Sequence, residues 1–322
     1  MEKLMTKENR LIFIYNPRSG KGQIKNKLSD IINCFAEAGK EITVHPTQCA
    51  KDALETIKRV GAQYEMVVVS GGDGTLNEAY NGLMAIDEEE RPLFGYIPMG
   101  STNDFATTLR ISKNPVTAAR GIMKGKTFWC DAGQATTGYF AYVAAFGIFT
   151  EVSYATPQET KNVLGHFAYI LEGIKSLTSL ESYQMQVTYE DEEGKEQSIN
   201  DKFLYGMVSN TRFVGGMNLI KETELDLQDG MFEVLLIRHP ENPIELQQTI
   251  TALLMKDFSS NRFYFFRTKK ISITGQKEVS WTLDGEFGGT VKQMDVTNVA
   301  KAIHMKYKPI PKRNVFGKEK EV

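Results

Sequence analysis

The sequence feature that most constrains the fold is a short apolar run, Met66–Val69, that leads directly into a glycine-rich segment, Ser70–Thr75. A run of this kind, rich in β-branched residues and bounded by turn residues, predicts a strand that is buried on both faces. Similar runs begin at Leu11 and Leu93, and amphipathic helix patterns lie between them. Strands that alternate with helices predict an α/β region with a mainly parallel sheet.

The pattern changes after about residue 132. Short strand-like segments joined by turns follow, for example Met185–Tyr189 and Phe232–Ile237, and the main helix pattern runs over Pro243–Leu254. A second helix is expected to begin at Thr156–Pro157, because Thr is a good N-cap and Pro is tolerated at the first helical position. Short strands in succession favour an antiparallel β region, a sandwich or an open barrel.

The length of 322 residues exceeds what one hydrophobic core usually covers. We therefore predict an α/β domain over residues 1–132, an antiparallel β-sandwich domain over residues 133–310, and a charged tail over residues 311–322.

Composition argues against several classes of protein. The net charge of −2 gives no global electrostatic reason to bind nucleic acid, and no apolar run approaches the roughly 20 residues that span a bilayer. Cys34, Cys49 and Cys130 are widely spaced, which argues against a disulfide scaffold and against a structural zinc site. The charged N-terminus lacks the apolar core of a signal peptide. We expect a cytoplasmic protein with no transmembrane segment and no nucleic-acid partner.

The glycine-rich segment continues as Gly71–Glu78 and opens a helix pattern. Glycine has no Cβ, so backbone N–H groups can approach phosphate oxygens closely, and a helix N-terminus favours anions. The carboxylate of Asp73 would repel a phosphate unless a cation lay between them, so it indicates Mg²⁺. Thr75 and Glu78 have the spacing of a capping box. A tight turn that binds no ligand is the alternative.

Gly100–Phe105 repeats this arrangement after the strand that begins at Leu93. Ser101 and Asp104 again have capping-box spacing, and small hydroxyl residues can contact phosphate or ribose. Taken alone, the segment is better explained as an ordinary helix cap. Because the carboxyl ends of parallel strands meet at one edge, the two glycine-rich turns are expected to border one crevice.

A third turn, Asn16–Gly22, follows the first strand. It is not a Walker A loop, because the upstream glycine is missing and Gly22 stands where a Ser or Thr would hold Mg²⁺. Its polar groups can still border phosphates. Lys21 is either part of that border or a solvated lysine at a helix start.

Asp284 and Glu286 stand two residues apart in the C-terminal region. Neighbouring carboxylates raise one pKa, which suits a general base that accepts the proton of an alcohol. An Asp-Gly turn at a strand end explains the same residues without any chemistry. Asp226–Gly230 is likewise either a loop that binds a metal or a turn before the next strand.

These residues together resemble a known family. Gly71–Glu78 and Ile97–Phe105 are similar to the diacylglycerol kinase catalytic domain, and most similar to bacterial soluble lipid kinases related to the sphingosine kinases. The first motif alone is shared with NAD kinases and phosphofructokinases. The later elements favour lipid kinases and extend the resemblance over nearly the whole chain: Asn16–Pro17, Thr156–Pro157, Asp229–Gly230 and Leu283–Glu286.

The resemblance implies an N-terminal nucleotide-binding domain, a C-terminal domain with the lipid site, and catalysis in the cleft between them. It implies that Asp284 or Glu286 accepts the substrate proton and that Asp73 joins the catalytic charge network. The residues that it implies for ATP binding are Asn16, Pro17, Arg18, Ser19, Gly20, Lys21, Thr47, Gly71, Gly72, Gly74, Thr75, Leu76, Asn77, Glu78 and Ser101.

The resemblance also implies a structural Mg²⁺ held by Asp226, Asp229 and the carbonyl of Met231. Here the sequence departs from the family pattern, because Gln228 replaces an acidic residue. The departure leaves the role of Asp226 open.

We therefore predict a lipid kinase that uses ATP and Mg²⁺ and visits the inner face of the membrane from the cytoplasm. It would transfer the γ-phosphoryl group to a lipid hydroxyl, most directly that of diacylglycerol, to give phosphatidic acid. The alternatives are a soluble-metabolite kinase of the NAD kinase type and a catalytically silent protein that binds lipid or nucleotide. The lipid head group, the acyl preference and the formation of a homodimer stay open.

Overall fold

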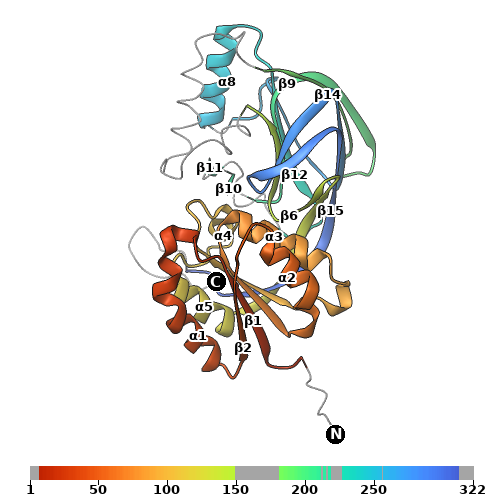
Figure 1. The fold of residues 1–322 in the computed structure, drawn as a ribbon. Coiled ribbons are helices and arrows are strands. Elements are labelled where there is room, and N and C mark those ends of the chain that lie inside the picture. Colours follow the sequence, from red (N-terminus) through yellow and green to blue (C-terminus); the bar gives the residue numbers. More distant parts are fainter. Residues whose placement is uncertain are drawn as a thin grey trace. The chain divides into compact units, whose positions relative to one another are not determined.

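The computed structural model describes residues 7–148, 181–211, 213–214, 217–218, 227–255 and 257–311. The chain forms two compact units (Figure 1): unit 1 comprises Met1–Trp129 with Ile303–Val322, and unit 2 comprises Cys130–Ala302. The chain passes from one unit to the other within β5 (Lys126–Ala135) and again within β15 (Glu286–Tyr307). The domain borders at 132 and 310 stay predictions.

Unit 1 is built on a parallel sheet. Besides the end of β15, its strands are β1 (Arg10–Tyr15), β2 (Glu41–Pro46), β3 (Met66–Gly71) and β4 (Leu93–Pro98). They lie in the order β15–β4–β3–β1–β2, and β15 joins in parallel through Met305, which pairs with Phe94. All six residues of β3 are buried, as the apolar run predicts. The predicted α/β region is confirmed.

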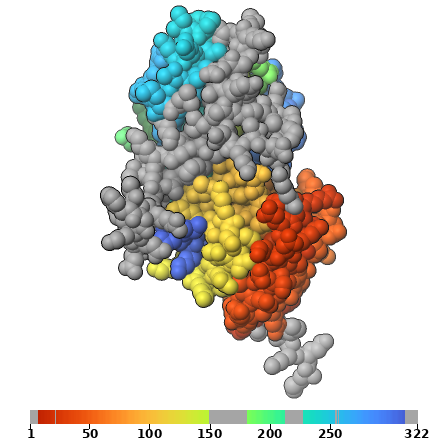
Figure 2. Space-filling model, turned by 90° about the vertical axis from the view of Figure 1, so that its left-hand side faces the viewer, coloured from red at the N-terminus to blue at the C-terminus, as the bar shows by residue number. Residues whose placement is uncertain are grey.

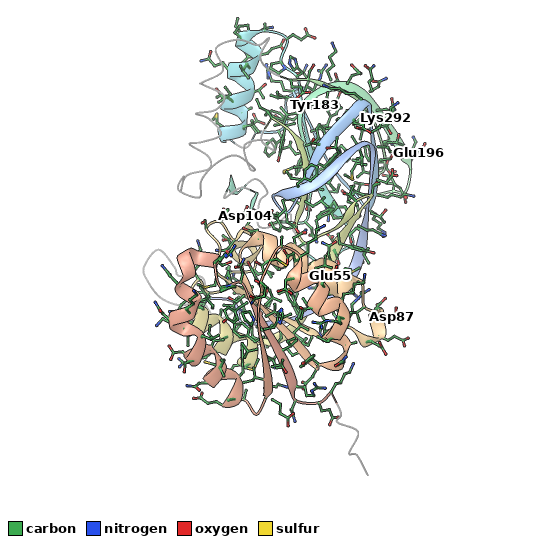
Figure 3. All side chains as sticks on the ribbon, viewed as in Figure 1. Glu55, Asp87, Asp104, Tyr183, Glu196 and Lys292 are labelled. Atoms are coloured by element: carbon green, nitrogen blue, oxygen red, sulfur yellow. The ribbon has the colours of Figure 1, made fainter. Side chains whose placement is uncertain are left out.

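Helices cover both faces of this sheet. Helix α1 packs against α5, and α2 packs against α3. Figure 2 shows the first pair, with the red residues of α1 beside the yellow residues of α5. Charged side chains such as Glu55 and Asp87 point away from the sheet (Figure 3). The helical elements are η1 (Ser19–Lys27), α1 (Leu28–Ala36), α2 (Asp52–Val60), η2 (Gly61–Gln63), α3 (Asp73–Met84), η3 (Glu88–Glu90), α4 (Asp104–Thr108) and α5 (Pro115–Lys124).

Both predicted capping boxes are wrong. The N-cap of α3 is Gly72, so the helix begins two residues before Thr75, and Thr75 is buried inside its first turns. The N-cap of α4 is Asn103, whose φ of 52° is left-handed, a conformation that Asn tolerates better than most residues. In both turns the helix begins after a glycine or an asparagine, and the hydroxyl groups of Thr75 and Ser101 do not set its first residue.

Unit 2 is a mostly antiparallel β structure, as predicted. The long strands β9 and β14 each pair with β8 over one part of their length and with β7 over another. The sheet path continues from β9 to β12 and β13, and from β14 to β15. The elements are β6 (Gly138–Phe140), β7 (Val143–Gly147), β8 (Tyr183–Glu190), β9 (Glu196–Ser209), β10 (Phe213–Val214), β11 (Met217–Asn218), β12 (Phe232–Arg238), α8 (Pro243–Met255), β13 (Phe263–Thr268) and β14 (Lys270–Leu283).

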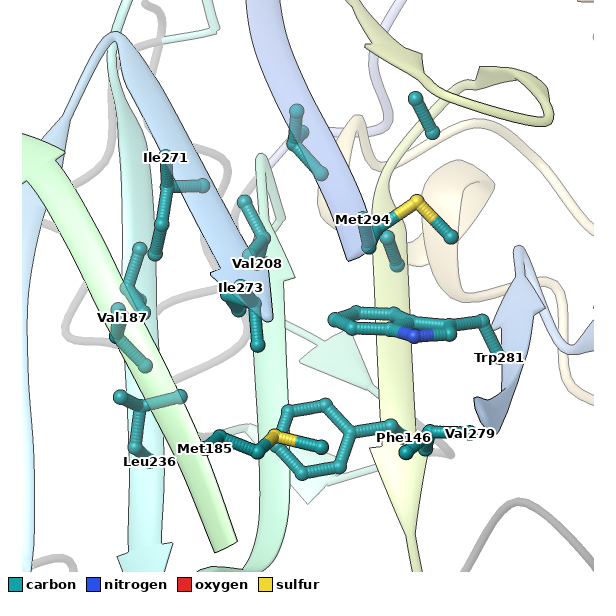
Figure 4. Close-up of a cluster of buried hydrophobic side chains, with 14 of the residues drawn as sticks. Phe146, Met185, Val187, Val208, Leu236, Ile271, Ile273, Val279, Trp281 and Met294 are labelled. Carbon is teal, nitrogen blue, oxygen red and sulfur yellow. The ribbon is translucent and has the colours of Figure 1, made fainter. Parts of the chain in front are cut away.

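The core of unit 2 follows from alternation along its strands (Figure 4). In β14 the buried apolar side chains are at odd positions, from Ile271 and Ile273 to Val279, Trp281 and Leu283. The pairing with β15 shifts register between Thr274 and Val279, yet the same face stays inside on both sides of this irregularity. The ring centroids of Trp281 and Phe146 lie 4.9 Å apart at the centre of the cluster.

Helix α8 confirms the helix predicted from Pro243, whereas the helix predicted to begin at Thr156–Pro157 lies outside the described residues. Among the helices that the structure describes, none has the length and apolar character needed to cross a membrane.

Candidate functional site

The candidate nucleotide site lies at the carboxyl edge of the sheet in unit 1. Strand β1 has β2 on one side and β3 on the other, so the order of the sheet reverses there, and ligands of open α/β sheets bind at such a switch point. The N–H of Asn16, just after β1, donates to the carbonyl of Ser70 in β3 over 2.9 Å. The first turn and the glycine-rich turn therefore begin side by side.

Glycines allow the three turns to pack backbone against backbone. A Cβ on Gly100 would lie 2.7 Å from the Cα of Gly72, which is closer than real atoms approach. A Cβ on Gly20, whose φ is +58°, would lie 2.8 Å from the carbonyl oxygen of Met99. These glycines are needed to bring the turns together as well as to expose their N–H groups.

Asp73 links two of these turns. Its Oδ2 accepts a hydrogen bond of 3.0 Å from the N–H of Asn103. The side chain of Asn103 in turn accepts from the N–H of Gly100 (2.8 Å) and donates to the Gly100 carbonyl (2.6 Å). The carboxylate at the start of α3 therefore holds the turn after β4 in place.

The other residues implied for ATP binding are distributed over the same edge. Thr47 follows β2, and its N–H donates to the carbonyl of Tyr15 over 2.9 Å. Ser101 is exposed after β4, whereas the side chain of Leu76 is fully buried, so that residue could contact a nucleotide only through its backbone. The remaining positions lie in the first turn and η1 (Pro17, Arg18, Ser19, Lys21) or at the end of β3 and the start of α3 (Gly71, Gly74, Thr75, Asn77).

The side chain of Glu78 contacts the start of helix α2. Its carboxylate accepts hydrogen bonds from the backbone N–H groups of Lys51 (2.7 Å) and Ala53 (3.2 Å), at the start of α2. Burial raises the pKa of Glu78 above its ordinary value. The side chain of Glu78, on α3, is therefore hydrogen-bonded to the start of α2.

In unit 2, Asp284 and Gly285 form the two-residue turn that joins β14 to β15. Both have positive φ, 53° and 83°, as a type I′ turn requires, and Leu283 pairs with Glu286 across it. The Asp-Gly turn expected as the plain alternative is therefore present. Its presence does not exclude a catalytic use of the two carboxylates.

The two carboxylates have very different surroundings. Asp284 is 1% exposed, and its oxygens accept hydrogen bonds from the N–H groups of Ala141 (2.7 Å), Tyr142 (2.9 Å) and Val143 (3.1 Å). Three backbone donors of this kind fix the orientation of the carboxyl group. Glu286 is exposed to solvent.

Two of the three residues implied for metal binding are described. Oδ1 of Asp229 accepts from the N–H of Met231 over 2.9 Å, and its Oδ2 is paired with the guanidinium of Arg267. The carbonyl of Met231 accepts from the side-chain amide of Asn298 over 3.2 Å. Asp226 lies outside the described residues.

Two buried carboxylates near Asp229 were missed from the sequence. Asp131 accepts from the N–H groups of Gly230 and Lys301, each over 2.8 Å, and burial raises its pKa. Burial also raises the pKa of Glu233 to about 8, although the nearby Arg267 opposes the shift. The only sequence signal was a single acidic residue inside each apolar strand, Asp131 in β5 and Glu233 in β12.

The pKa of Glu233 predicts a pH dependence of stability. Its folded-state pKa is raised, so the folded state holds the proton more tightly, and stability should fall as pH rises from about 4.5 to about 8. Relative to Glu233→Gln, the wild type should lose roughly 2–4 kcal/mol of unfolding free energy over this range. Denaturant melts between pH 5 and pH 8.5, with EDTA present, measure the difference. The exposed-site variant Glu196→Gln should keep the wild-type slope, and a Glu233→Gln slope equal to wild type would refute the prediction.

Comparisons with known proteins agree with this architecture. The family model described as the diacylglycerol kinase catalytic domain matches residues 10–135. The diacylglycerol kinase of Bacillus subtilis (strain 168) is 31% identical over 298 residues, which cover 92% of this chain and 95% of that protein. The diacylglycerol kinase of Staphylococcus saprophyticus is 31% identical over 282 residues, covering 87% of this chain and 90% of that one.

The same fold occurs in a crystal structure of a diacylglycerol kinase from Bacillus anthracis strain Sterne. The TM-score is 0.72 at 22% identity, and the match covers 94% of this chain and 97% of that one. An α/β unit followed by an antiparallel β unit is thus the architecture of a known class of kinases. The chain belongs to the diacylglycerol kinase family.

Proposed function

We propose that this protein is an ATP-dependent lipid kinase that phosphorylates the free hydroxyl of diacylglycerol to give phosphatidic acid. The observation that carries the proposal is the meeting of three turns at the switch point of the sheet, two of which are joined by the bond from Asn103 to Asp73. Kinases of this family use ATP. Diacylglycerol is proposed as the acceptor because the similar bacterial proteins are named diacylglycerol kinases.

Phosphoryl transfer needs positioning and neutralisation of charge more than covalent chemistry. In this proposal, the N–H groups of the glycine-rich turns bind the phosphates of ATP, and the start of α3 adds its positive dipole end. Asp73 would hold the Mg²⁺ that accompanies the phosphates while keeping the turn after β4 in register. Thr47 and Ser101 would border the rest of the nucleotide.

Asp284 and Glu286 are both candidates for the group that accepts the hydroxyl proton. The exposure of Glu286 supports direct access to a substrate. The three N–H groups around Asp284 support a fixed carboxyl group that orients the segment Ala141–Val143 or receives the proton itself. The two assignments predict different effects of substitution.

The oxygen donors around Asp229 are our candidates for a structural Mg²⁺ site, although among the described residues no three His, Cys, Asp or Glu side chains are grouped to hold a metal ion, so the proposed site depends on Asp226. The implied donors are all oxygens, which is the ligand type that Mg²⁺ prefers. Among the described residues, the carboxylates of Asp131 and Asp229 and the guanidinium of Arg267 lie in this region, whereas Glu233, whose pKa burial raises to about 8, holds its proton near neutral pH. A further cation would offset the remaining negative charge. We propose Asp226, Asp229 and the carbonyl of Met231 as its ligands. When bound, Mg²⁺ would cross-link this loop and lower its negative charge.

Mg²⁺ is therefore expected to raise the melting temperature of the wild type and to raise that of Asp229→Asn much less. A ligand that binds only the folded state stabilises it by RT ln(1 + [L]/Kd), about 2.7 kcal/mol at a hundred times Kd. Thermal melts over a Mg²⁺ titration measure the shift for each protein against its own metal-free value. Glu196→Gln, an exposed substitution labelled at its site in Figure 3, serves as the control. Equal Mg²⁺ shifts in the wild type and Asp229→Asn would contradict the site.

A panel of acceptors tests the proposed function. The purified protein is incubated with γ-labelled ATP and, in separate reactions, with mixed micelles of diacylglycerol, monoacylglycerol, ceramide or sphingosine, or with soluble NAD. Label in phosphatidic acid is expected. Label in NADP would establish a soluble-metabolite kinase of the NAD kinase type. Nucleotide binding without any transfer would establish a catalytically silent binding protein.

A further inference from the structure

The side chain at the N-cap position of helix α2 does not cap the first backbone N–H groups of the helix. Its N-cap is Lys51, which has a left-handed φ of 66° and, within the described part of the chain, makes no side-chain cap hydrogen bond. The first N–H groups of any helix have no partner inside the helix and need an acceptor from elsewhere. A left-handed φ at a non-glycine residue is also strained, so the surrounding structure must enforce it.

The missing acceptor comes from helix α3. Oε1 of Glu78 accepts the N–H of Lys51 over 2.7 Å, and its Oε2 accepts the N–H of Ala53 over 3.2 Å. One carboxylate thus satisfies two donors, and its negative charge lies at the positive end of the α2 dipole. Glu78 therefore caps a helix that begins 26 positions before it in the sequence, counted from Asp52 to Glu78.

A second carboxylate, on α2 itself, holds the other side of the same loop. Oδ2 of Asp52 accepts the N–H of Gln48 over 2.7 Å, and its Oδ1 lies 3.2 Å from Nε2 of His45. The segment Thr47–Lys51 is thus bonded at one end to Asp52 and at the other to Glu78. Since the N–H of Thr47 donates to the last residue of β1, Tyr15, the segment is fixed at the carboxyl edge of the sheet.

We infer that Glu78 is a positioning residue, which holds the Thr47–Lys51 segment ready for the nucleotide and does not contact the nucleotide itself. The inference rests on the proposed function, because it assigns that segment to the nucleotide site. It differs from the role implied by resemblance, in which Glu78 binds ATP directly. The glycine-rich motif would then build two parts of the site, its own turn and the loop after β2.

The test uses Glu78→Gln and Glu78→Asp, with Asp87→Asn as the control. Gln keeps one acceptor but directs an NH₂ group at the second backbone donor, and Asp keeps the charge but is one methylene too short to reach both donors. Asp87 is an exposed acid after α3, outside the segment that is measured, and makes neither contact (Figure 3). Hydrogen exchange, followed by mass spectrometry on peptides that cover residues 46–56, reports on the loop.

Both Glu78 variants are expected to exchange faster over residues 46–56 than the wild type, and Asp87→Asn is expected to match the wild type. The KM for ATP should rise about tenfold in the Glu78 variants, as expected for the loss of roughly one hydrogen bond to a charged group, with a smaller change in kcat. The KM for the lipid acceptor should stay the same. Two variants of Glu78 are used so that the test can still be made if one of them does not fold.

Three results would overturn the inference. A raised KM for ATP with unchanged exchange would mean that Glu78 contacts the nucleotide directly. Faster exchange with an unchanged KM would mean that the cap only stabilises α2. A wild type that neither binds ATP nor turns it over would remove the proposed function itself, and this failure is distinguishable because it occurs without any substitution.

Discussion

Replacing Asp73 with Asn is expected to lower kcat for phosphoryl transfer by about a hundredfold or more and to leave the melting temperature close to that of the wild type. The amide oxygen of Asn can still accept the N–H of Asn103, so the turn after β4 stays in place. The negative charge that would hold Mg²⁺ beside the phosphates is lost, and removing one preorganised electrostatic contact typically costs about 10²–10³ in kcat. Steady-state rates and thermal melts on the same preparations measure both effects.

Asp73→Ala and Asp87→Asn complete this experiment. The alanine variant loses the charge and also the bond to Asn103, so its melting temperature should fall below that of Asp73→Asn. Asp87 is an exposed acid in the same unit, after α3, and its substitution should change neither rate nor stability (Figure 3). Near-normal turnover by Asp73→Asn would reduce Asp73 to a structural link between two turns.

The second large effect concerns Asp284 and Glu286. Asp284→Asn is expected to lose both activity and stability, because an NH₂ group would face one of the N–H donors of Ala141–Val143. Losing a buried, charge-assisted hydrogen bond costs roughly 1.5–3 kcal/mol. Glu286→Gln should leave stability unchanged, because Glu286 is exposed. If Glu286 is the general base, kcat falls by about 10²–10⁴ in this variant with little change in the KM for ATP.

The comparison of the two variants identifies the proton acceptor. A wild-type kcat for Glu286→Gln together with a folded but inactive Asp284→Asn would assign the proton to Asp284. Folded variants that both kept a wild-type kcat would show that the Asp-Gly turn is only a turn. Thermal melts are needed beside the rates, because the buried position of Asp284 makes loss of folding a competing cause of inactivity.

Features that depend on near neighbours in the sequence were predictable. Strand β3 is buried on both faces, and its four apolar residues reveal this directly. The meeting of the turns also followed from the sequence, because parallel strands place their carboxyl ends at one edge. Helix α8 begins at Pro243, as the tolerance of helix starts for proline suggests.

Features that depend on distant contacts were not predictable. The spacing of Thr75 and Glu78 suggested a capping box, but Glu78 bonds to α2 because the two helices pack together. Asp284 meets its backbone donors about 140 positions away in the chain. Strand β15 mixes exposed and buried residues over 22 positions, and its end joins the sheet of unit 1, so neither a single period nor a turn signal marks it.

The central claim is that this chain transfers the γ-phosphoryl group of ATP to diacylglycerol through the site at Asp73. The most direct measurement is a single-turnover reaction with excess enzyme, γ-labelled ATP and dioleoylglycerol in mixed micelles, for the wild type and Asp73→Asn. The account predicts that the wild type converts the label to phosphatidic acid within one turnover and that Asp73→Asn does so at least about a hundredfold more slowly. Label that stays in ATP with the wild type, or equal rates for the two proteins, would contradict it.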